Sequence, residues 1–409
     1  MAITPTDLFL IIFSPACAML IAYALSTSSI KKSLNTNPGI FDKIEPLRGV
    51  AAALVVIHHS FYSYNLTYNA RWAPLHAGLT DIPQPLINII ASFGGVGVII
   101  FFMITGFLFV DKAVKCDGQI DFKKFYIGRF FRIVPAYIFV VIFVFAVAIL
   151  TGARIYQSYS DYISAVFSWL LFGLAKPYTI SSHIDNYLIV AGVFWTLGVE
   201  WKFYFLYPLI CQFSKIKTAT VALVLSAVMV SFLMIIGFFE GINGGILLSF
   251  IFGGLAALTL RFSMIIRSYL KNSLVSAFGF SISLYCIYIG MDVYSLFPCL
   301  GLFIAFVSMS NGASVFGILN LKVFRWMGAI SYSLYLSHGV FYFLFNKILI
   351  NNHEYLAPSA LAVLFAVAFS VVSYHFVEVK GISFGRNLSN KKKVRFGERD
   401  HLLVKPSNP

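Results

Sequence analysis

Apolar runs of about twenty residues recur along most of the chain. They cover residues 8–25, 46–64, 87–110, 133–151, 188–213, 218–238, 243–260, 273–290, 294–310, 327–349 and 357–377. A helix needs about 20 mainly apolar residues to cross the ~30 Å hydrocarbon core of a bilayer. The pattern therefore predicts an all-α, polytopic integral membrane helical bundle with about eleven transmembrane helices.

The loops between these runs alternate between basic and uncharged. Two or more Lys or Arg residues occur in loops 26–45, 111–132, 214–217, 261–271 and 311–326, and the tail is also basic. Loops 239–242, 291–293 and 350–356 have none, and loop 65–86 has only Arg71. Short cytoplasmic loops are enriched in Lys and Arg. The alternation therefore predicts an N-terminus outside the cell and a cytoplasmic C-terminus.

Two further segments decide the domain organisation. Residues 162–175 are apolar, but a run of 14 residues is short for a span, so we interpret it as interfacial or re-entrant within an outside excursion at 152–187. The basic segment 380–409 is expected to be a disordered cytoplasmic tail near anionic lipids. Residues 1–41 supply an additional N-terminal transmembrane helix and a cytoplasmic loop. Residues 42–379 then form one membrane domain.

The composition supports a membrane protein and limits its partners. Of the 409 residues, 59% are hydrophobic and 11% are charged, with a mean hydropathy of +0.85. These values exclude an ordinary soluble domain. The net charge of +14 is explained by the basic loops, so no nucleic-acid partner is expected. The five cysteines are scattered without a Cys-x-x-Cys or His-rich spacing, so no metal site is expected.

Residues 48–60 place an arginine and two histidines in an otherwise apolar helix. At about 100° per residue, Arg48 and His59 return to within ~20° of one face, while His58 falls ~80° away from it. His59 lies ~16 Å farther along the helix than Arg48. Ionisable groups inside an apolar span are costly and usually mark function. The alternative is a histidine bonded within the bundle and an arginine that reaches the headgroups.

Two more arginines lie where a basic loop enters the next helix. Arg129 and Arg132 are three residues apart in the run 126–132, so they share a helix face. Together with Arg48 on the same side of the membrane, they would form an anion site for a phosphorylated cytoplasmic ligand. The alternative explanation is the ordinary positive charge of cytoplasmic loops.

Glu200 lies near the middle of the apolar run 188–213. A buried carboxylate needs a partner or a proton. Lys202 is close in sequence, but residues two apart on a helix do not face each other. A pairing with His59 from another helix would orient the imidazole and stabilise its charged form, which suits general base catalysis. We therefore expect a Glu200–His59 pair.

Five motifs occur in an order that resembles the membrane acyltransferase 3 family. They are Arg48-x10-His59, the run Gly97–Leu108, the run Tyr126–Arg132, Trp195-Thr-Leu-x-x-Glu200 and Ile330–His338. The resemblance covers residues 42–378, and the family acylates sugars and other acceptors at or across the membrane. Departures from the commoner family pattern are Thr105 in place of serine, Trp201-Lys202 after Glu200, and Glu378-Val379-Lys380 in place of Glu-x-Pro.

The resemblance implies an acyl-coenzyme A donor, with acetyl-CoA favoured, and a catalytic role for His59 supported by Arg48 and Glu200. Candidate donor-binding residues are Arg48, Arg129, Arg132, Tyr126 and Trp195. The expected protein is an O-acyltransferase, most simply an O-acetyltransferase, of the bacterial inner (cytoplasmic) membrane. It would modify a cell-envelope polysaccharide or a lipid-linked sugar, with membrane lipids as its surroundings. His59 would remove the acceptor proton, either in direct transfer or with an acyl-histidine intermediate.

Other functions are compatible with parts of this pattern. A transporter or flippase could use buried Arg, His and Glu side chains as a substrate or proton path. A non-catalytic membrane scaffold would leave the five ordered motifs without a role. His338, on an apolar helix, is either a hydrogen-bonded core histidine or a contact to the acceptor. Loss of an acyl group from envelope glycans would distinguish the enzyme from the transporter.

Overall fold

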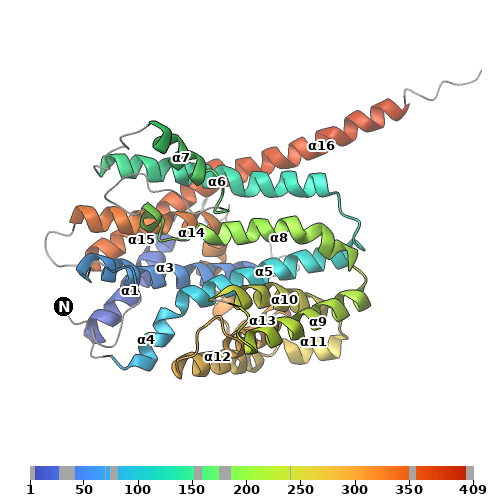
Figure 1. Ribbon diagram of the computed structural model, residues 1–409, viewed down its shortest axis with the longest axis horizontal. Helices are drawn as coiled ribbons and strands as arrows, with labels where there is room; N and C mark the ends of the chain where they lie inside the picture. Colours follow the sequence, from blue (N-terminus) through green and yellow to red (C-terminus); the bar gives the residue numbers. More distant parts are fainter. Residues whose placement is uncertain are drawn as a thin grey trace, which may run out of the picture.

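The computed structural model describes residues 5–26, 42–69, 71–73, 82–151, 159–174, 186–239, 241–349 and 356–401. Every regular element in these ranges is helical (Figure 1), which confirms the predicted all-α class. The helices are α1 (Pro5–Leu25), α3 (Ile44–Asn69), α4 (Gln84–Ala91), α5 (Phe93–Lys115), α6 (Phe122–Leu150), α7 (Tyr159–Trp169), α8 (Trp195–Gln212), α9 (Ile216–Ile235), α10 (Asn243–Thr259), α11 (Met264–Leu270), α12 (Ser273–Tyr288), α13 (Leu296–Ser310), α14 (Lys322–Leu349), α15 (Leu356–Ser373) and α16 (Val379–His401). Two short 3-10 helices, η2 (Asn186–Val190) and η3 (Ile318–Asn320), and one π-helical turn, η4 (Tyr374–Glu378), complete the bundle.

Each predicted apolar run overlaps helical structure, although 87–110 is divided between α4 and α5 and 188–213 begins in η2 and continues into α8. By length and composition, however, only 4 helices in the described ranges could cross a membrane, or 5 if a pair bent by 50° counts as one span. The predicted count of about eleven is therefore not confirmed. Two causes are visible: α10 and α13 have only 17 and 15 residues, and α3 and α14 bury several serines and other polar side chains inside the bundle.

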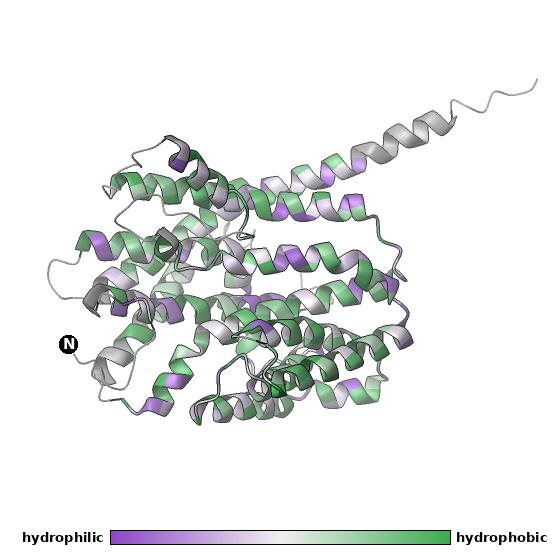
Figure 2. Ribbon diagram, in the orientation of Figure 1, coloured by the Kyte–Doolittle hydropathy of each residue, from purple (hydrophilic) through white to green (hydrophobic). Residues whose placement is uncertain are grey.

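Large apolar side chains cover much of the outside of the bundle. On α9, Leu225, Val228, Met229 and Phe232 are all exposed. Only 17% of the most apolar part of this helix is buried, and hydrophobic positions dominate most of the bundle helices (Figure 2). Soluble monomers rarely expose apolar surfaces of this extent. This is therefore an integral membrane protein whose peripheral helices face lipid.

Helices α3 and α14 run in the same direction and pack closely. A Cβ on Gly49 would lie 2.0 Å from a backbone oxygen of α14, and one on Gly328 would lie 2.0 Å from a backbone oxygen of α3. Glycine therefore permits the close approach of the two backbones. Farther along, the Tyr342 hydroxyl donates to the Val56 carbonyl oxygen at 3.1 Å. The contact continues along both helices and places their central residues side by side.

Polar contacts join the same two helices at their N-terminal ends. Asp42, just before α3, accepts hydrogen bonds from Lys43 at 2.7 Å and from Arg325 in the first turn of α14. The hydrogen bond from Lys43, aided by the nearby guanidinium, holds the pKa of Asp42 below its usual range. Lys43 also donates to Asn320 at 2.6 Å. The relative position of α3 and α14 is thus fixed at their start.

The basic tail differs from its prediction. Helix α16 continues from η4 through a residue range that was expected to be disordered. A Cβ on Gly381 or on Gly385 would lie 2.7 Å from Phe131, so α16 packs directly against α6. The expectation of disorder is wrong for this part, because it considered charge and not packing. Residues 402–409 lie outside the described ranges.

The predicted excursion at 152–187 contains α7, a helix of 11 residues. This length is too short to cross a bilayer. The Tyr137 hydroxyl of α6 donates to the carbonyl of Trp169 at 2.5 Å, which ties the end of α7 to the bundle. Residues 152–158 and 175–185 of the excursion lie outside the described ranges.

Candidate active site

The middle of α3 brings His59 against His338 of α14. His59 Nδ1 and His338 Nε2 are 2.9 Å apart, and His338 Nδ1 lies 3.0 Å from the Leu334 carbonyl oxygen. A carbonyl oxygen only accepts hydrogen bonds, so His338 Nδ1 donates. If His338 is neutral, its Nε2 accepts from His59 Nδ1, and this assignment leaves His59 Nε2 unprotonated.

The surroundings of His338 favour the neutral ring. Its side chain is 1% exposed, and both ring nitrogens are hydrogen-bonded to groups without negative charge. Burying a charge without a compensating partner costs far more than burying a neutral ring. The hydrogen-bond order therefore presents the Nε2 lone pair of His59 as a base. This chain of contacts supplies the orientation that the sequence had led us to expect from a carboxylate.

The expected Glu200–His59 pair is wrong. Glu200 accepts a hydrogen bond from the Tyr204 hydroxyl, one turn along α8, and it lines a different cavity from His59. Helical periodicity predicts the face on which a residue lies but not which helix packs against that face. The position beside His59 is occupied by His338, which the sequence had left as either a core histidine or an acceptor contact.

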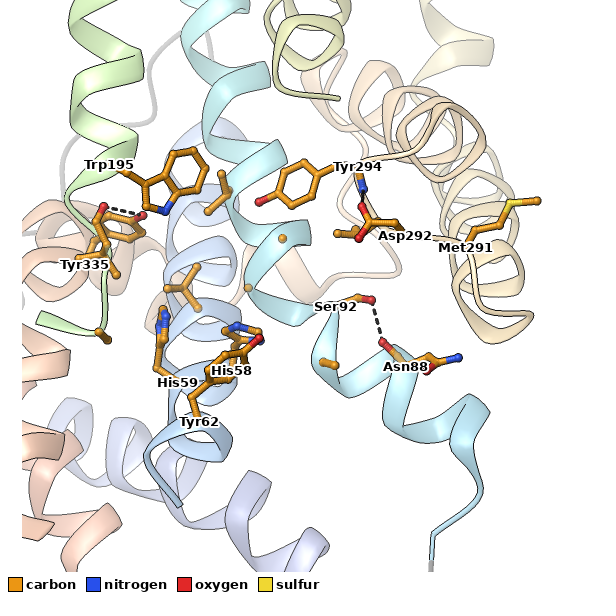
Figure 3. A pocket seen from close by; sticks show the side chains of 18 of the residues that line it. His58, His59, Tyr62, Asn88, Ser92, Trp195, Met291, Asp292, Tyr294 and Tyr335 are labelled. Carbon is orange, nitrogen blue, oxygen red and sulfur yellow. Dashed lines mark hydrogen bonds between the residues drawn. The ribbon is translucent and has the colours of Figure 1, made fainter. Parts of the chain in front are cut away.

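His59 lines a cavity of about 450 Å³, which we call the histidine cavity. Figure 3 shows His58, His59 and Tyr62 on one side of it and Asn88, Ser92 and Asp292 on the other. Among the described residues, the lining is Val55, His58, His59, Tyr62, Asn88, Ala91, Ser92, Gly94, Gly95, Val98, Ala191, Val193, Trp195, Gly290, Met291, Asp292, Val293, Tyr294 and Tyr335. Helices α3, α4 and α5 and the loop between α12 and α13 therefore meet around one space.

His58 also lines the histidine cavity, although its helical phase differs from that of His59. Its ring centroid lies 4.6 Å from that of Tyr62 and 5.0 Å from that of His59. A Cβ on Gly94 would lie 2.5 Å from the His58 ring, so the glycine makes room for it. No hydrogen-bond partner is found for His58 Nδ1 among the described residues. The His58 ring is hydrogen-bonded to the backbone of Ala91 and not to another histidine, so its orientation differs in kind from that of His59.

A second cavity, of about 160 Å³, lies between α3, α5, α6, α8 and α14, and we call it the arginine cavity. Its lining is Arg48, Val98, Phe101, Phe102, Ile104, Thr105, Leu108, Phe109, Arg129, Arg132, Ile133, Thr196, Leu197, Glu200, Tyr204, Ser331, Tyr332 and Tyr335. Three guanidinium groups face one carboxylate, so the lining is net positive. Arginine binds phosphate through paired hydrogen bonds as well as charge.

An aromatic contact positions one of these arginines. The Arg129 guanidinium lies 4.9 Å from the ring centroid of Phe109, a cation–π contact. The structure thus brings Arg48, Arg129, Arg132 and Glu200 together. It does not bring the other two donor candidates there. Tyr126 donates to the Tyr204 carbonyl oxygen at 3.1 Å without lining the cavity, and Trp195 lines the histidine cavity instead.

One wall separates the two cavities. Val98 and Tyr335 line both of them. The Thr196 and Tyr335 hydroxyl oxygens are 2.9 Å apart, and both hydroxyls lie within hydrogen-bond distance of the Val193 carbonyl oxygen, at 2.9 Å and 3.4 Å. Arg48 lies on one side of this wall and His59 on the other, so the predicted face of α3 borders both cavities.

Sequence reasoning missed several residues of this arrangement. Tyr335 and Thr196 stand inside two of the recognised motifs, and that membership was the available signal. Asn88 lies at the start of the apolar run 87–110 and Asp292 in the loop 291–293, and nothing in their immediate sequence marks them as cavity residues. Their location depends on how α4 and the loop before α13 meet in space.

The chain is similar to known proteins over most of its length. A family described as an acyltransferase domain matches residues 41–375. The O-acetyltransferase OatA of Staphylococcus aureus (strain NCTC 8325 / PS 47) is 22% identical over 378 residues, covering 84% of this chain and 57% of that protein. Nodulation protein 10 of Rhizobium leguminosarum bv. viciae is 34% identical over 161 residues, covering 37% of this chain and 42% of that protein.

A third relative comes from a virus. The O-acetyl transferase of Shigella phage Sf6 is 30% identical over 158 residues, covering 38% of this chain and 42% of that protein. The chain thus spans between 42% and 57% of the length of these relatives. No solved structure matches it.

Proposed function

Because this chain belongs to the acyltransferase domain family, we propose that it is a membrane O-acetyltransferase. It transfers the acetyl group of acetyl-CoA to a hydroxyl of a cell-envelope glycan or a lipid-linked sugar. The observation that carries the proposal is the meeting of the two cavities at one wall, with three arginines on one side and a hydrogen-bonded histidine on the other. The names of the relatives from Staphylococcus aureus and phage Sf6 support the acetyl group.

The donor occupies the arginine cavity. Arg48, Arg129 and Arg132 hold phosphate groups of acetyl-CoA. Glu200 lines the same cavity, so it contributes to donor binding by positioning these arginines. The thioester end then extends toward Val98 and Tyr335. An acetyl group is small enough to approach His59 past these two side chains after a modest displacement.

The acceptor hydroxyl reaches the same point from the histidine cavity. His59 Nε2 takes the hydroxyl proton as the oxygen attacks the thioester carbonyl carbon. The new carbon–oxygen bond forms, the carbon–sulfur bond breaks, and the coenzyme A thiolate receives the proton from His59. His338 accepts from His59 Nδ1 throughout, which holds the ring and its tautomer in place.

The arrangement in the membrane is part of this proposal. All eleven predicted runs span the bacterial inner membrane, the N-terminus lies outside, and the C-terminus is cytoplasmic. The arginine cavity then opens toward the cytoplasm, where acyl-CoA is made. Residues 1–41 precede the catalytic domain 42–379, and 380–409 form the cytoplasmic basic segment. The alternation of basic and uncharged loops supports this topology.

Thiol labelling in intact cells tests the topology. In a variant without the five native cysteines, Met291→Cys is expected to react with a membrane-impermeant maleimide, because its loop lacks Lys and Arg. Lys215→Cys is expected to react only after the membrane is opened. Both positions are exposed. Reaction of both cysteines from the same side would contradict the proposed topology.

Mass analysis of envelope glycans tests the function directly. Cells that carry the gene are expected to contain glycans with one acetyl mass increment per modified sugar, and cells without it are expected to lack this increment. Expression of the His59→Ala variant serves as the matched control. Unchanged glycan chemistry with altered glycan export would instead support a transporter or flippase.

Replacement of His338 tests its positioning role. In His338→Leu the acceptor for His59 Nδ1 is removed, and kcat is expected to fall roughly 10- to 100-fold with KM for acetyl-CoA unchanged. His338→Gln has nearly the same volume, but its amide oxygen can replace Nε2 as acceptor, so it is expected to recover most of the lost rate. Acetyl transfer by purified protein provides both constants. Equal losses in the two variants would indicate a packing role only.

A further inference from the structure

The side of the histidine cavity that faces His59 is polar. Asn88 and Ser92 come from the α4 segment and Asp292 from the loop before α13 (Figure 3). Aromatic rings of Tyr62, Trp195 and Tyr294 complete the lining around them. The volume of about 450 Å³ lies within the range for small-ligand sites, about 300–1,000 Å³. Apolar ring faces combined with a few polar groups suit a sugar ring, which has both C–H faces and hydroxyls.

Asp292 has one carboxylate oxygen available for a ligand. Its Oδ1 accepts the backbone N–H of Tyr294 at 2.8 Å, and its own carbonyl oxygen accepts from the Ser295 hydroxyl at 2.6 Å. These two contacts fix the loop and the side chain. The second oxygen, Oδ2, has no hydrogen-bond partner among the described residues, and Asp292 is exposed to the cavity. An ionised carboxylate oxygen accepts hydroxyl hydrogens strongly.

Asn88 offers the complementary donor. Its side-chain oxygen accepts from Gln84 Nε2 at 2.8 Å, which leaves the Nδ2 hydrogens to face elsewhere. Nδ2 lies 3.9 Å from the position that a Cβ on Gly290 would take, so the amide faces the loop that carries Asp292. The backbone carbonyl of Asn88 is occupied by the Ser92 hydroxyl at 2.7 Å. Asp292 thus brings a carboxylate acceptor, and Asn88 an amide donor on the side near Gly290, to the same side of the cavity lining.

The charges of the two cavities are opposite. Within the described lining of the histidine cavity, Asp292 is the only carboxylate, and Lys and Arg are absent. The arginine cavity has three guanidinium groups and one carboxylate. A phosphate or carboxylate on a ligand is therefore attracted to the arginine cavity and repelled by the histidine cavity.

We propose that Asp292 and Asn88 form an acceptor subsite that selects an uncharged sugar ring over one that carries a carboxylate or phosphate. The inference rests on the proposed acetyl transfer and deepens it by naming the class of acceptor. Asp292 Oδ2 accepts from one ring hydroxyl, and Asn88 Nδ2 donates to a neighbouring one. The hydroxyl on the opposite edge of the ring then points toward His59. The aromatic side chains cover the C–H face of the sugar.

A pair of probes that differ in one group tests the subsite. Methyl glucoside is neutral, and methyl glucuronide has the same ring with a carboxylate. Binding of each to the purified full chain in lipid nanodiscs is measured by saturation-transfer NMR titration. The wild type is expected to bind the neutral ring at least about tenfold more tightly, since the anionic ring meets the like charge of Asp292.

Variants separate the local charge from the overall charge. Asp292→Asn is expected to reduce the neutral-to-anionic preference to less than about threefold, because the repulsion is removed. Asp161→Asn removes the same charge from an exposed position on α7 outside the cavity lining, and it is expected to keep the wild-type preference. Asn88→Ala is expected to weaken binding of both probes by a similar factor.

The outcomes distinguish the subsite from the proposed function. An unchanged preference in Asp292→Asn, or no saturable binding of methyl glucoside to the wild type, would overturn the subsite. Acetylation of the probes from acetyl-CoA is followed by mass spectrometry in the same samples. Selective binding that depends on Asp292 but gives no acetylated product would support the subsite and contradict the acetyltransferase function.

Discussion

His59→Ala is expected to lower acetyl transfer by about 10²- to 10⁴-fold, the usual range for loss of a general base. The substitution removes the proposed base, a ring that lines the histidine cavity, and leaves the lining of the arginine cavity unchanged. Binding of coenzyme A should therefore persist while turnover is lost. Transfer by the purified protein, normalised to the amount of folded protein in the membrane, is the measurement.

His58→Ala is the matched control for this prediction. His58 is the adjacent residue, lines the same cavity and has a ring of identical size, but its Nδ1 lacks a hydrogen-bond partner within the described ranges. Its replacement is expected to reduce the rate by less than about tenfold, since ring contacts with Tyr62 and His59 and a hydrogen bond to the Ala91 backbone are lost but the His59–His338 hydrogen bond remains. If His58→Ala abolished transfer and His59→Ala did not, the assignment of the base would be reversed.

Weaker donor binding is the second large effect, expected when an arginine of the arginine cavity is replaced by lysine. Lysine keeps the positive charge but loses the planar group that binds phosphate through two hydrogen bonds. Arg48→Lys, Arg129→Lys and Arg132→Lys are each expected to weaken acetyl-CoA binding by roughly 1–3 kcal/mol, or about 5- to 150-fold in Kd. Isothermal titration with coenzyme A measures the affinity. The largest effect is expected at Arg48, because its helix also carries His59.

Arg261→Lys provides the comparison for the donor site. Arg261 pairs with Asp111 at 2.7 Å and lies outside the lining of the arginine cavity. Its replacement is expected to leave coenzyme A affinity unchanged. Unchanged affinity in all three arginine-cavity variants would identify those arginines as topology signals, and the main support for cytoplasmic donor entry would be lost.

The sequence was most informative about features that lie within a single helix. Apolar runs located the helices, and the phase of α3 placed Arg48 and His59 on the face that borders both cavities. It was less informative where a residue on one helix meets a residue on another. Glu200 and His59 were matched by chemical type, yet the structure pairs Glu200 with Tyr204 and His59 with His338.

Contacts between separate elements also determined the structure of the basic tail and of the acceptor side of the histidine cavity, and the sequence did not predict them. Charge alone suggested that the segment after residue 379 would be disordered, but packing of Gly381 and Gly385 against α6 accompanies a helix. Asp292 had no helical phase to interpret, because it lies in a loop. Its proximity to Asn88 depends on the meeting of two elements about 200 residues apart in the chain.

A relative rotation of α3 and α14 about their glycine contact would be amplified along both helices. Gly49 and His59 are ten residues apart, as are Gly328 and His338, so each histidine lies about 15 Å from this contact along its helix. A rotation of about 5° there would move one histidine relative to the other by about 1.3 Å. Their 2.9 Å hydrogen bond would then be lost. A small change of residue size at Gly49 or Gly328 would therefore be enough to break the hydrogen bond that orients His59, although neither glycine lines either cavity.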